Sequence, residues 1–144
     1  MDATTGDYRL TTDPGARDLD AIHRFLADAY WAIGRPTEVI DRSLEGSLVF
    51  SLLHEGRQVG MARVVTDRAT FAWLCDVYVE PAHRGHGIGA WMIEQVLAHP
   101  DVAGLRTWLL GTTYSHSLFA RFGFTPLADP SRFMIRHPAD APGP

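Results

Sequence analysis

Three glycines alternate with other residues directly after an arginine, in the stretch R-G-H-G-I-G that begins at Arg84. Gly85, Gly87 and Gly89 carry no side chain, so the backbone there can turn tightly and bring several N–H groups toward one anion. An apolar run follows, which places these groups at the start of a helix, where the helix dipole also favours negative charge. With the forked cation of Arg84 beside it, the stretch predicts a phosphate-binding turn.

The same stretch excludes two common nucleotide-binding motifs. A P-loop needs G-K-[ST] after its glycines, and no such sequence follows here. A dinucleotide fingerprint needs the spacing G-x-G-x-x-G, whereas these glycines alternate. We therefore expect a different ligand that contains a pyrophosphate.

The order V-x-P-x-x-R-G-x-G-I-G resembles the acetyl-CoA-binding motif of the GNAT (Gcn5-related N-acetyltransferase) superfamily. The core of that motif is R/Q-x-x-G-x-G/A, here Arg84, Gly87 and Gly89. Downstream, L-F-A-R-F-G-F-T-P (118–126) resembles the family's L-Y-x-K-x-G-F segment. The two motifs occur in the expected order, and the resemblance covers roughly residues 7 to 136.

The resemblance implies an α/β (α+β) fold with a mixed, mostly antiparallel central sheet of six to seven strands and about four helices. One parallel βαβ unit would carry the CoA site, and its two strands would splay apart around the pantetheine arm. The resemblance also implies a set of residues that contact acetyl-CoA, with the amides of 85–90 on the pyrophosphate: Val77, Tyr78, Val79, Arg84, Gly85, His86, Gly87, Ile88, Gly89, Ala90 and Phe119.

Hydrophobic periodicity and turn residues predict the elements that position this turn. Strands are expected at 8–10, 47–54, 58–66, 70–79 and 105–110, and a final pair from Phe124 and from Phe133–Arg136. Helices are expected from Asp13 and Pro14 to near Tyr30, over Thr37–Leu44, from the glycine turn to about His99, and over Ser115–Phe122. Asp13 and Thr37 are the expected N-caps, and Gly123 is the expected C′ residue. Val79 and 105–110 would be parallel neighbours.

Length and composition predict one domain over 1–144, with 137–144 as a disordered tail, because 144 residues that are 46% hydrophobic suffice for a single core. A net charge of −4 gives no basic footprint for nucleic acid or an anionic membrane, and favours cationic small molecules or basic peptides as partners. A lone cysteine, no apolar run of about 20 residues and no signal pattern predict a cytoplasmic protein. A homodimer is one possible assembly.

Asp76 is the first candidate for a catalytic group. Acetyl transfer needs a deprotonated amine, and a lysine-like amine with a pKa of about 10.4 is almost fully protonated near neutral pH. Asp76 interrupts the apolar run L-C-D-V-Y-V, with strand parity opposite to that of Val77 and Val79. It would accept the proton or hold the ammonium group; equally, it would pair with an arginine such as Arg63.

His116 is the second candidate, because its pKa lies in the working range and it begins the helix expected to face the cofactor channel. An exposed histidine in a first helical turn is the alternative. The family's segment usually supplies a tyrosine as general acid to the CoA thiolate, and this chain has Phe119 there. Tyr114 and Tyr78 are possible substitutes, and solvent protonation is another, since a thiol titrates near about 8.5.

An acceptor pocket is predicted from the aromatic residues Tyr30, Trp31, Trp73 and Tyr78, with Asp28 or Glu38 at its mouth. The alternative is packing in the core and lid, which is favoured for Trp73. No metal is expected: His83 and His86 lack a third ligand at a usual spacing, and solvent exposure is favoured for both. Cys75 is expected to be a buried thiol and no acyl carrier.

The leading hypothesis is an acetyl-CoA-dependent N-acetyltransferase in which a bound primary amine of a small molecule or peptide attacks the thioester directly. The alternative from another class is a non-catalytic acyl-CoA-binding or regulatory module, which the loss of the tyrosine at Phe119 permits. Transfer to a protein terminus or lysine is a third hypothesis. The bulky connection W-A-I-G-R-P argues for a closed small-molecule site instead.

Overall fold

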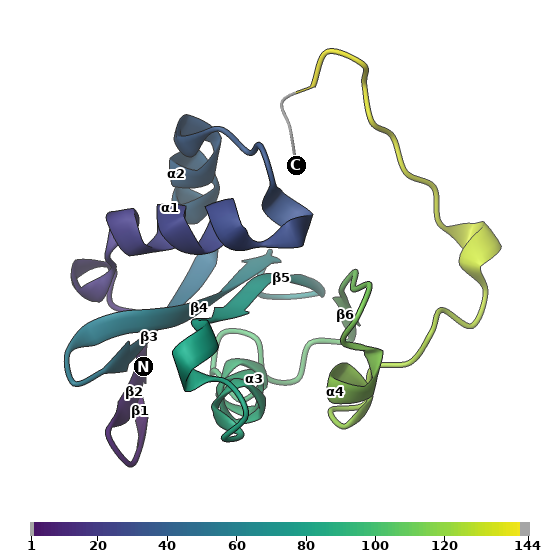
Figure 1. Cartoon of the computed structure of the whole chain (residues 1–144). Helices are drawn as coiled ribbons and strands as arrows, with labels where there is room; N and C mark the ends of the chain where they lie inside the picture. The colour runs from purple at the N-terminus through teal and green to yellow at the C-terminus, as the bar shows by residue number, and fades with distance from the viewer. Residues whose placement is uncertain (1, 142–144) are drawn as a thin grey trace.

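The centre of the molecule is a six-stranded sheet in which the strands follow one another in sequence order (Figure 1). The structure is a computed structural model that describes residues 2–141. The strands are β1 (Asp2–Thr5), β2 (Tyr8–Thr11), β3 (Leu48–His54), β4 (Arg57–Thr66), β5 (Phe71–Val79) and β6 (Thr107–Leu109). All neighbours pair antiparallel except β5 and β6, which pair parallel. The predicted mixed, mostly antiparallel sheet with one parallel unit is confirmed.

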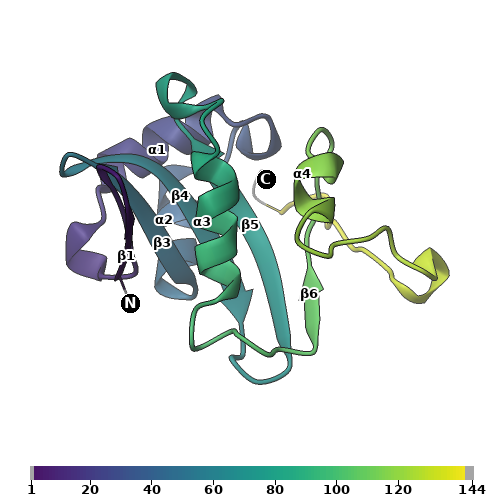
Figure 2. The ribbon, with the colours of Figure 1, turned by 90° about the horizontal axis from the view of Figure 1, so that it is seen from below.

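Helices cover both faces of the sheet. Helices α1 (Leu19–Asp28) and α2 (Thr37–Glu45) lie on one face, and α3 (Ile88–Leu97) and α4 (His116–Ala120) lie on the other (Figures 1 and 2). Each face has its own core of buried side chains, one centred on Phe25 and Met61 and the other on Phe50 and Met92. Short 3-10 turns occur at Pro14–Ala16, Tyr30–Ala32, Pro81–His83 and Pro130–Arg132. In the described part of the chain, no helix combines the length and apolarity that a membrane crossing needs.

The start of the chain differs from the prediction in two places. A polar strand, β1, forms a hairpin with β2, and its lack of apolar residues hid it from pattern reasoning. Asp13 caps a separate 3-10 turn through Gly15 N–H (2.9 Å), and α1 begins later, where Asp18 accepts from Ala21 N–H (3.0 Å). Likewise α2 has no side-chain cap, because Pro36 occupies the N-cap position ahead of the expected residue, Thr37.

Strand β5 contains the irregularity that matters most for the site. Its register with β4 shifts between the Met61 and Arg63 partners, and Asp76 has a φ of 49°, which is rare for a residue with a side chain. The parallel pairing with β6 covers only Phe71 to Trp73, so the prediction that Val79 is a parallel neighbour of that strand is wrong. The two strands therefore share a short ladder and part beyond Trp73, as the resemblance implied.

The expected final strand pair does not form in the described residues. After Gly123, whose φ of 89° makes it the predicted left-handed end of α4, the chain leaves the domain as an extended segment (Figure 2). Phe133, Met134 and Ile135 are 51%, 98% and 80% exposed, so this apolar stretch has no sheet neighbour to pair with. Of the predicted tail, residues 142–144 lie outside the described residues.

Candidate active site

The glycine turn joins the end of β5 to the start of α3. Gly85 and Gly87 have φ values of 84° and 79°, a region that residues with side chains avoid. A Cβ atom at either position would meet nothing within 4 Å, so the backbone conformation, and not a lack of space, is what requires glycine. Within residues 2–141, the backbone N–H groups of 85–90 have no acceptor. The turn thus presents unpaired donors at a helix N-terminus, which is what an anionic ligand needs.

Arg84 is folded back onto the end of β5. Its Nε donates to the Val79 carbonyl at 2.7 Å, and its guanidinium carbon lies 5.3 Å from the centre of the Tyr78 ring. The side chain is thereby held beside the glycine turn. Its predicted contact with a phosphate stays a prediction.

Next to the gap between β5 and β6 lies a cavity of about 620 Å³. It is lined by residues from the 3-10 turn after α1, from β4 and β5, and from the segment that joins β6 to α4. The lining side chains and backbone belong to Tyr30, Trp31, Arg35, Arg63, Val65, Phe71, Trp73, Leu74, Cys75, Asp76, Val77, Leu110, Gly111, Thr112, Ser115, Leu118 and Phe119. The cavity therefore brings three of the predicted acceptor residues, Tyr30, Trp31 and Trp73, to the end of the predicted cofactor gap.

Asp76 is the centre of an ionic cluster in the cavity wall. Its side chain is 1% exposed, and its two oxygens accept from Arg63 Nε (2.8 Å), Arg35 Nη1 (3.0 and 3.1 Å) and Trp31 Nε1 (2.9 Å). Burial acts to raise the pKa of Asp76, but the charges of the two arginines and their hydrogen bonds outweigh it and lower the pKa. A carboxylate so engaged is a poor proton acceptor, and the interpretation that Asp76 pairs with Arg63 is confirmed.

Cys75 and Asp76 lie on successive positions of the irregular part of β5, and both line the cavity. Cys75 is therefore a partly buried cavity residue, and the prediction of a buried thiol is wrong. Burial raises the pKa of its thiol to about 11, against the lowering effect of Arg63. The thiol stays protonated at neutral pH, which agrees with the expectation that Cys75 carries no acyl group.

Three of the predicted acceptor residues meet in the cavity: Tyr30, Trp31 and Trp73 all line it. Trp73 is 39% exposed, so the core-packing interpretation favoured for it is wrong. The Tyr30 hydroxyl accepts a hydrogen bond from the Thr113 backbone N–H (3.1 Å), which is the main cause of a lowered pKa for that phenol. This bond links the turn after α1 to the segment before α4.

The other residues of the predicted acceptor pocket lie elsewhere. The Tyr78 hydroxyl donates to Asp28 (3.0 Å), and its ring stacks on Phe25 of α1 at 4.9 Å between centroids. Neither Tyr78 nor Asp28 lines the cavity, because the tyrosine ring is packed in the core against α1. Glu38 is exposed on α2 and does not line the cavity either.

The remaining candidate catalytic residues are also outside this cavity. His116 is exposed and lines a second cavity of about 1220 Å³ between α4, β6 and the C-terminal segment. Tyr114 is 78% exposed, and its ring contacts Tyr30 edge-on at 5.0 Å. Phe119 is 8% exposed and lines both cavities, so the residue in the tyrosine's place does face the gap.

A protein-family comparison decides what this arrangement is. The model of the "Acetyltransferase (GNAT) family" matches residues 16–124, which include the glycine turn and all the residues that line the cavity around Asp76. The chain belongs to the GNAT family. Acetyltransferases of this family use acetyl-CoA as co-substrate, so the predicted family and the class of co-substrate agree with the comparison.

Relatives of this GNAT chain support the assignment. A protein of Gibberella zeae is 33% identical over 141 residues, which cover 82% of this chain and 78% of that one. A crystal structure from Xanthomonas campestris is 42% identical, with a TM-score of 0.88 over 93% of this chain and 95% of the other. Both are named "putative acetyltransferase". A GNAT structure from Elizabethkingia anophelis, described with acetyl-CoA bound, shares the fold at 14% identity (TM-score 0.66, 84% and 78% covered).

Sequence reasoning missed the arginine that completes the ionic cluster. Arg35 lies in the connection W-A-I-G-R-P, and its only local signal was a charge between Gly34 and Pro36. Two hydroxyl-bearing residues that line the cavity, Thr112 and Ser115, were also missed, although Ser115 lies at the start of the predicted helix.

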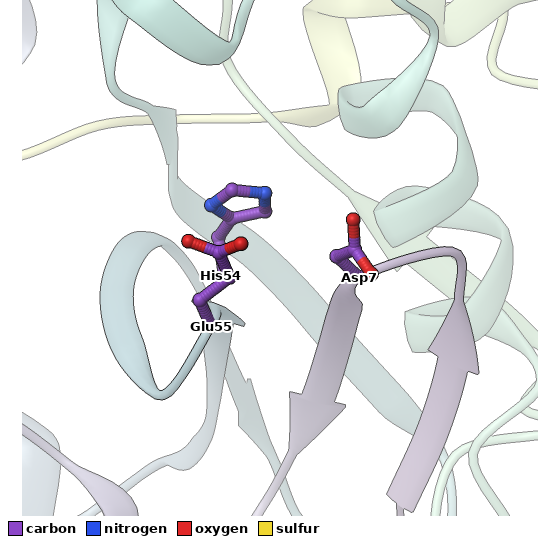
Figure 3. Close-up of side chains that lie close together, drawn as sticks. All are labelled: Asp7, His54 and Glu55. Carbon is purple, nitrogen blue, oxygen red and sulfur yellow. The ribbon is translucent and has the colours of Figure 1, made fainter.

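One histidine and two carboxylates gather near the β1–β2 turn. Asp7, His54 and Glu55 place their ligand atoms within 4.8 Å of one another, at the β1–β2 turn and the end of β3 (Figure 3). Both carboxylates are exposed, and none of the three residues lines either cavity, so we assign the group no function.

The two histidines near the glycine turn differ in exposure. His83 is half-buried, with its Nδ1 2.7 Å from the Tyr8 hydroxyl, so its predicted exposure is wrong. His86 is exposed, as predicted.

Proposed function

We propose that this GNAT protein is an N-acetyltransferase that moves the acetyl group of acetyl-CoA to a primary amine bound in the cavity beside β5. The observation that carries the proposal is the continuity between three features. The cavity around Asp76 and the parting of β5 from β6 beyond Trp73 lie along β5, and the free N–H groups of 85–90 lie in the turn and helix start that follow this strand. An extended thioester arm anchored at the turn would end at the cavity.

The reaction joins the amine nitrogen to the acetyl carbon and breaks the carbon–sulfur bond of the thioester. The electron pair of that bond leaves with sulfur, and the nitrogen loses one proton while the thiolate gains one. Amide donors at the strand edge near Val77 would orient the arm, and direct attack needs the amine within about 3–3.5 Å of the carbonyl carbon. No covalent enzyme intermediate is required, which fits a thiol at Cys75 that stays protonated.

Proton removal from the amine is assigned to water. The described residues that line the cavity include no histidine, and the carboxylate of Asp76 is held by two guanidinium groups and an indole. Phe119 faces the gap and cannot donate a proton, so we assign the proton of the departing thiolate to solvent as well. A free thiol with a pKa of about 8.5 takes up a proton readily near neutral pH.

The test is a titration with acetyl-CoA by calorimetry, followed in the same sample by thiol release against a panel of primary amines. We expect micromolar binding, on the order of −8 kcal/mol, by the wild type. Arg84→Ala should weaken it about tenfold through the loss of one charge-assisted contact, whereas Arg57→Ala, which removes an exposed arginine paired with Glu80, should not.

Thiol release with an amine would establish the enzyme. Binding without release from any amine would favour the alternative, a non-catalytic acyl-CoA-binding module. The buried Phe119 in the position of the family's tyrosine is the specific observation on that side. Absence of acetyl-CoA binding would contradict both.

A further inference from the structure

An apolar segment near the C-terminal end of the chain is left almost uncovered. We call residues 129–136 the C-terminal arm. Phe133, Met134 and Ile135 in this arm are all exposed, and Met134 is 98% exposed. In an extended segment, Met134 lies on the opposite face from Phe133 and Ile135. Both faces of the arm are therefore apolar, which is typical of a strand that is buried on both sides.

A hydrogen-bonded turn holds the C-terminal arm away from its own domain. Around the 3-10 turn Pro130–Arg132, the Arg132 N–H donates to the Asp129 carbonyl (3.2 Å) and the Phe133 N–H donates to the Pro130 carbonyl (3.1 Å). The Ser131 hydroxyl donates to the Asp129 carboxylate. The chain runs outward from α4 through this turn (Figure 2). The arm therefore does not fold back as a strand beside the residues that precede it.

The cavity of about 1220 Å³ beside α4 has the composition of a site for an extended apolar segment. It is lined by β6, α4, residues 124–128 and the arm itself, and Arg106 is the only side chain of fixed charge among the described residues that line it. Strand β6 is the last strand of the sheet, and within residues 2–141 its outer edge has no backbone partner. Such an edge can pair with a further extended segment.

We propose that a second copy of this chain covers the arm, in a symmetric dimer in which the arm of each copy adds to the β6 edge of the other. One chain supplies both the exposed segment and the free edge, so a reciprocal exchange closes with two-fold symmetry and leaves neither uncovered. This inference goes beyond the proposed N-acetyltransferase function and does not depend on it.

The area of the arm agrees with what a stable dimer needs. An aromatic side chain buries about 150–250 Å² when it is covered, and methionine and isoleucine are only slightly smaller. The three exposed side chains of the arm therefore supply roughly half of the about 800 Å² that each subunit of a stable complex buries. The groove along β6 that receives the other arm supplies a similar area.

The exchanged arm would also lie beside the active site. Trp73, Thr112 and Phe119 line both the cavity next to α4 and the cavity around Asp76. An arm from the other copy would contact this shared wall, so the second copy would complete one side of the site.

The first experiment is sedimentation equilibrium of the full chain. We expect the wild type to form a dimer with a Kd in the micromolar range or below. Met134→Asp should raise this Kd by about a hundredfold or more, because it places a charge in an apolar interface. Leu19→Asp is the matched control, since Leu19 is an exposed apolar residue of α1 that lines neither cavity, and the dimer should persist.

Circular dichroism checks that the Met134→Asp protein is folded, which we expect because this side chain is almost free of contacts within its own domain. A wild type that stays monomeric up to about 100 μM would overturn the proposal. A dimer whose Kd is the same in a folded Met134→Asp protein would overturn it too.

Hydrogen exchange then identifies the surface that the arm covers. We expect the amides of 105–111 and of 132–136 to be protected in the wild-type dimer and to exchange faster in Met134→Asp, with the amides of β3 unchanged. Protection of 132–136 in a monomeric wild type would mean that the arm folds onto its own domain. Rapid exchange of 132–136 in the dimer would mean that another surface joins the two copies, and either result would contradict the exchange of arms.

Discussion

The glycine turn and the cavity, which are the two ends of the proposed acetyl-CoA site, are built from different kinds of groups. At the glycine turn, the groups offered to a ligand are backbone N–H groups of consecutive residues, 85–90. At the cavity, they are side chains from distant places in the sequence, and Arg35 and Asp76, which are in direct contact, are 41 positions apart. A site made of consecutive backbone groups depends on local conformation. A site made of side chains depends on the whole fold holding them together.

The difference also appears in what stabilises each end. The turn needs two residues with positive φ and little packing, since a Cβ at Gly85 or Gly87 would meet open space. The cluster at Asp76 needs burial and paired charges, because its carboxylate is 1% exposed. We therefore expect changes at the cavity to affect stability strongly, and changes at the turn to affect cofactor binding more than stability.

The largest effect is expected from Asp76→Ala. Its removal leaves two mostly buried guanidinium groups without their shared carboxylate, which should lower the free energy of unfolding by about 3–5 kcal/mol. Asp101→Ala is the matched control, because its ion pair with Arg68 is exposed and should contribute about 0–1 kcal/mol. Urea unfolding of both variants measures the difference. Small and equal losses of unfolding free energy in the two variants would mean that the ionic cluster around Asp76 does not stabilise the fold.

The contribution of Asp76 to the free energy of unfolding should be lost gradually as the solution is made acidic. The pKa of Asp76 is lowered in the folded protein, and an unfolded aspartate titrates near about 3.9. Its contribution is therefore fully present above pH of about 4 and is lost as the pH falls through the lower, folded pKa. The stability difference between the wild type and Asp76→Asn, measured from pH 7 to pH 2, should be constant down to about pH 4 and then shrink. A difference that shrinks already between pH 7 and pH 5 would contradict the lowered pKa.

At the turn, Gly87→Val should reduce the affinity for acetyl-CoA by about tenfold to a hundredfold. A β-branched residue at a φ of 79° costs of order 1–3 kcal/mol of strain, which the turn would relieve by moving its N–H groups. Gly104→Val is the control, since Gly104 has a φ of 83°, equally open surroundings and no part in the turn. Calorimetry should show the loss of binding in the first variant only. A similar loss in both would point to a global effect of strain.

The smallest effect is expected from a substitution at Phe119, which lines the cavity and faces the gap between β5 and β6. Phe119→Tyr restores the tyrosine usual in the family at a residue that lines the cavity. If solvent protonates the thiolate, as proposed, kcat at neutral pH should change by less than about threefold, because the thiol pKa of about 8.5 makes an added acid unnecessary. A steady-state pH profile of the two proteins measures this. A rise of about a hundredfold in kcat would mean that proton donation limits the wild type.

Several sequence predictions depended on local signals and were confirmed. The meander β3–β5 follows from alternating apolar residues and short turns, and Gly123 is the left-handed end of α4. The GNAT family and the type of sheet were identified from two short motifs. Where local signals were weak, prediction failed: the polar strand β1 was missed, and the apolar residues of 133–136 led to a strand that does not form.

Other predictions stay untested. The cytoplasmic location, the possible homodimer and the absence of nucleic-acid, membrane and metal partners are still predictions. The individual contacts with acetyl-CoA, such as those of Arg84 and His86, are predictions too, although both residues lie in or beside the turn.

The sequence by itself determined the glycine turn, the family and the order of the elements, because each depends on residues that are neighbours in the chain. Only the tertiary structure decided what surrounds Asp76. The register of β5 against β4 shifts beside this carboxylate, and the connection after α1 brings Trp31 and Arg35 into contact with it. Arg35 and Asp76 are 41 positions apart in the chain, and their contact depends on how the sheet and helices pack. No local sequence pattern predicts a contact between residues so far apart in the chain.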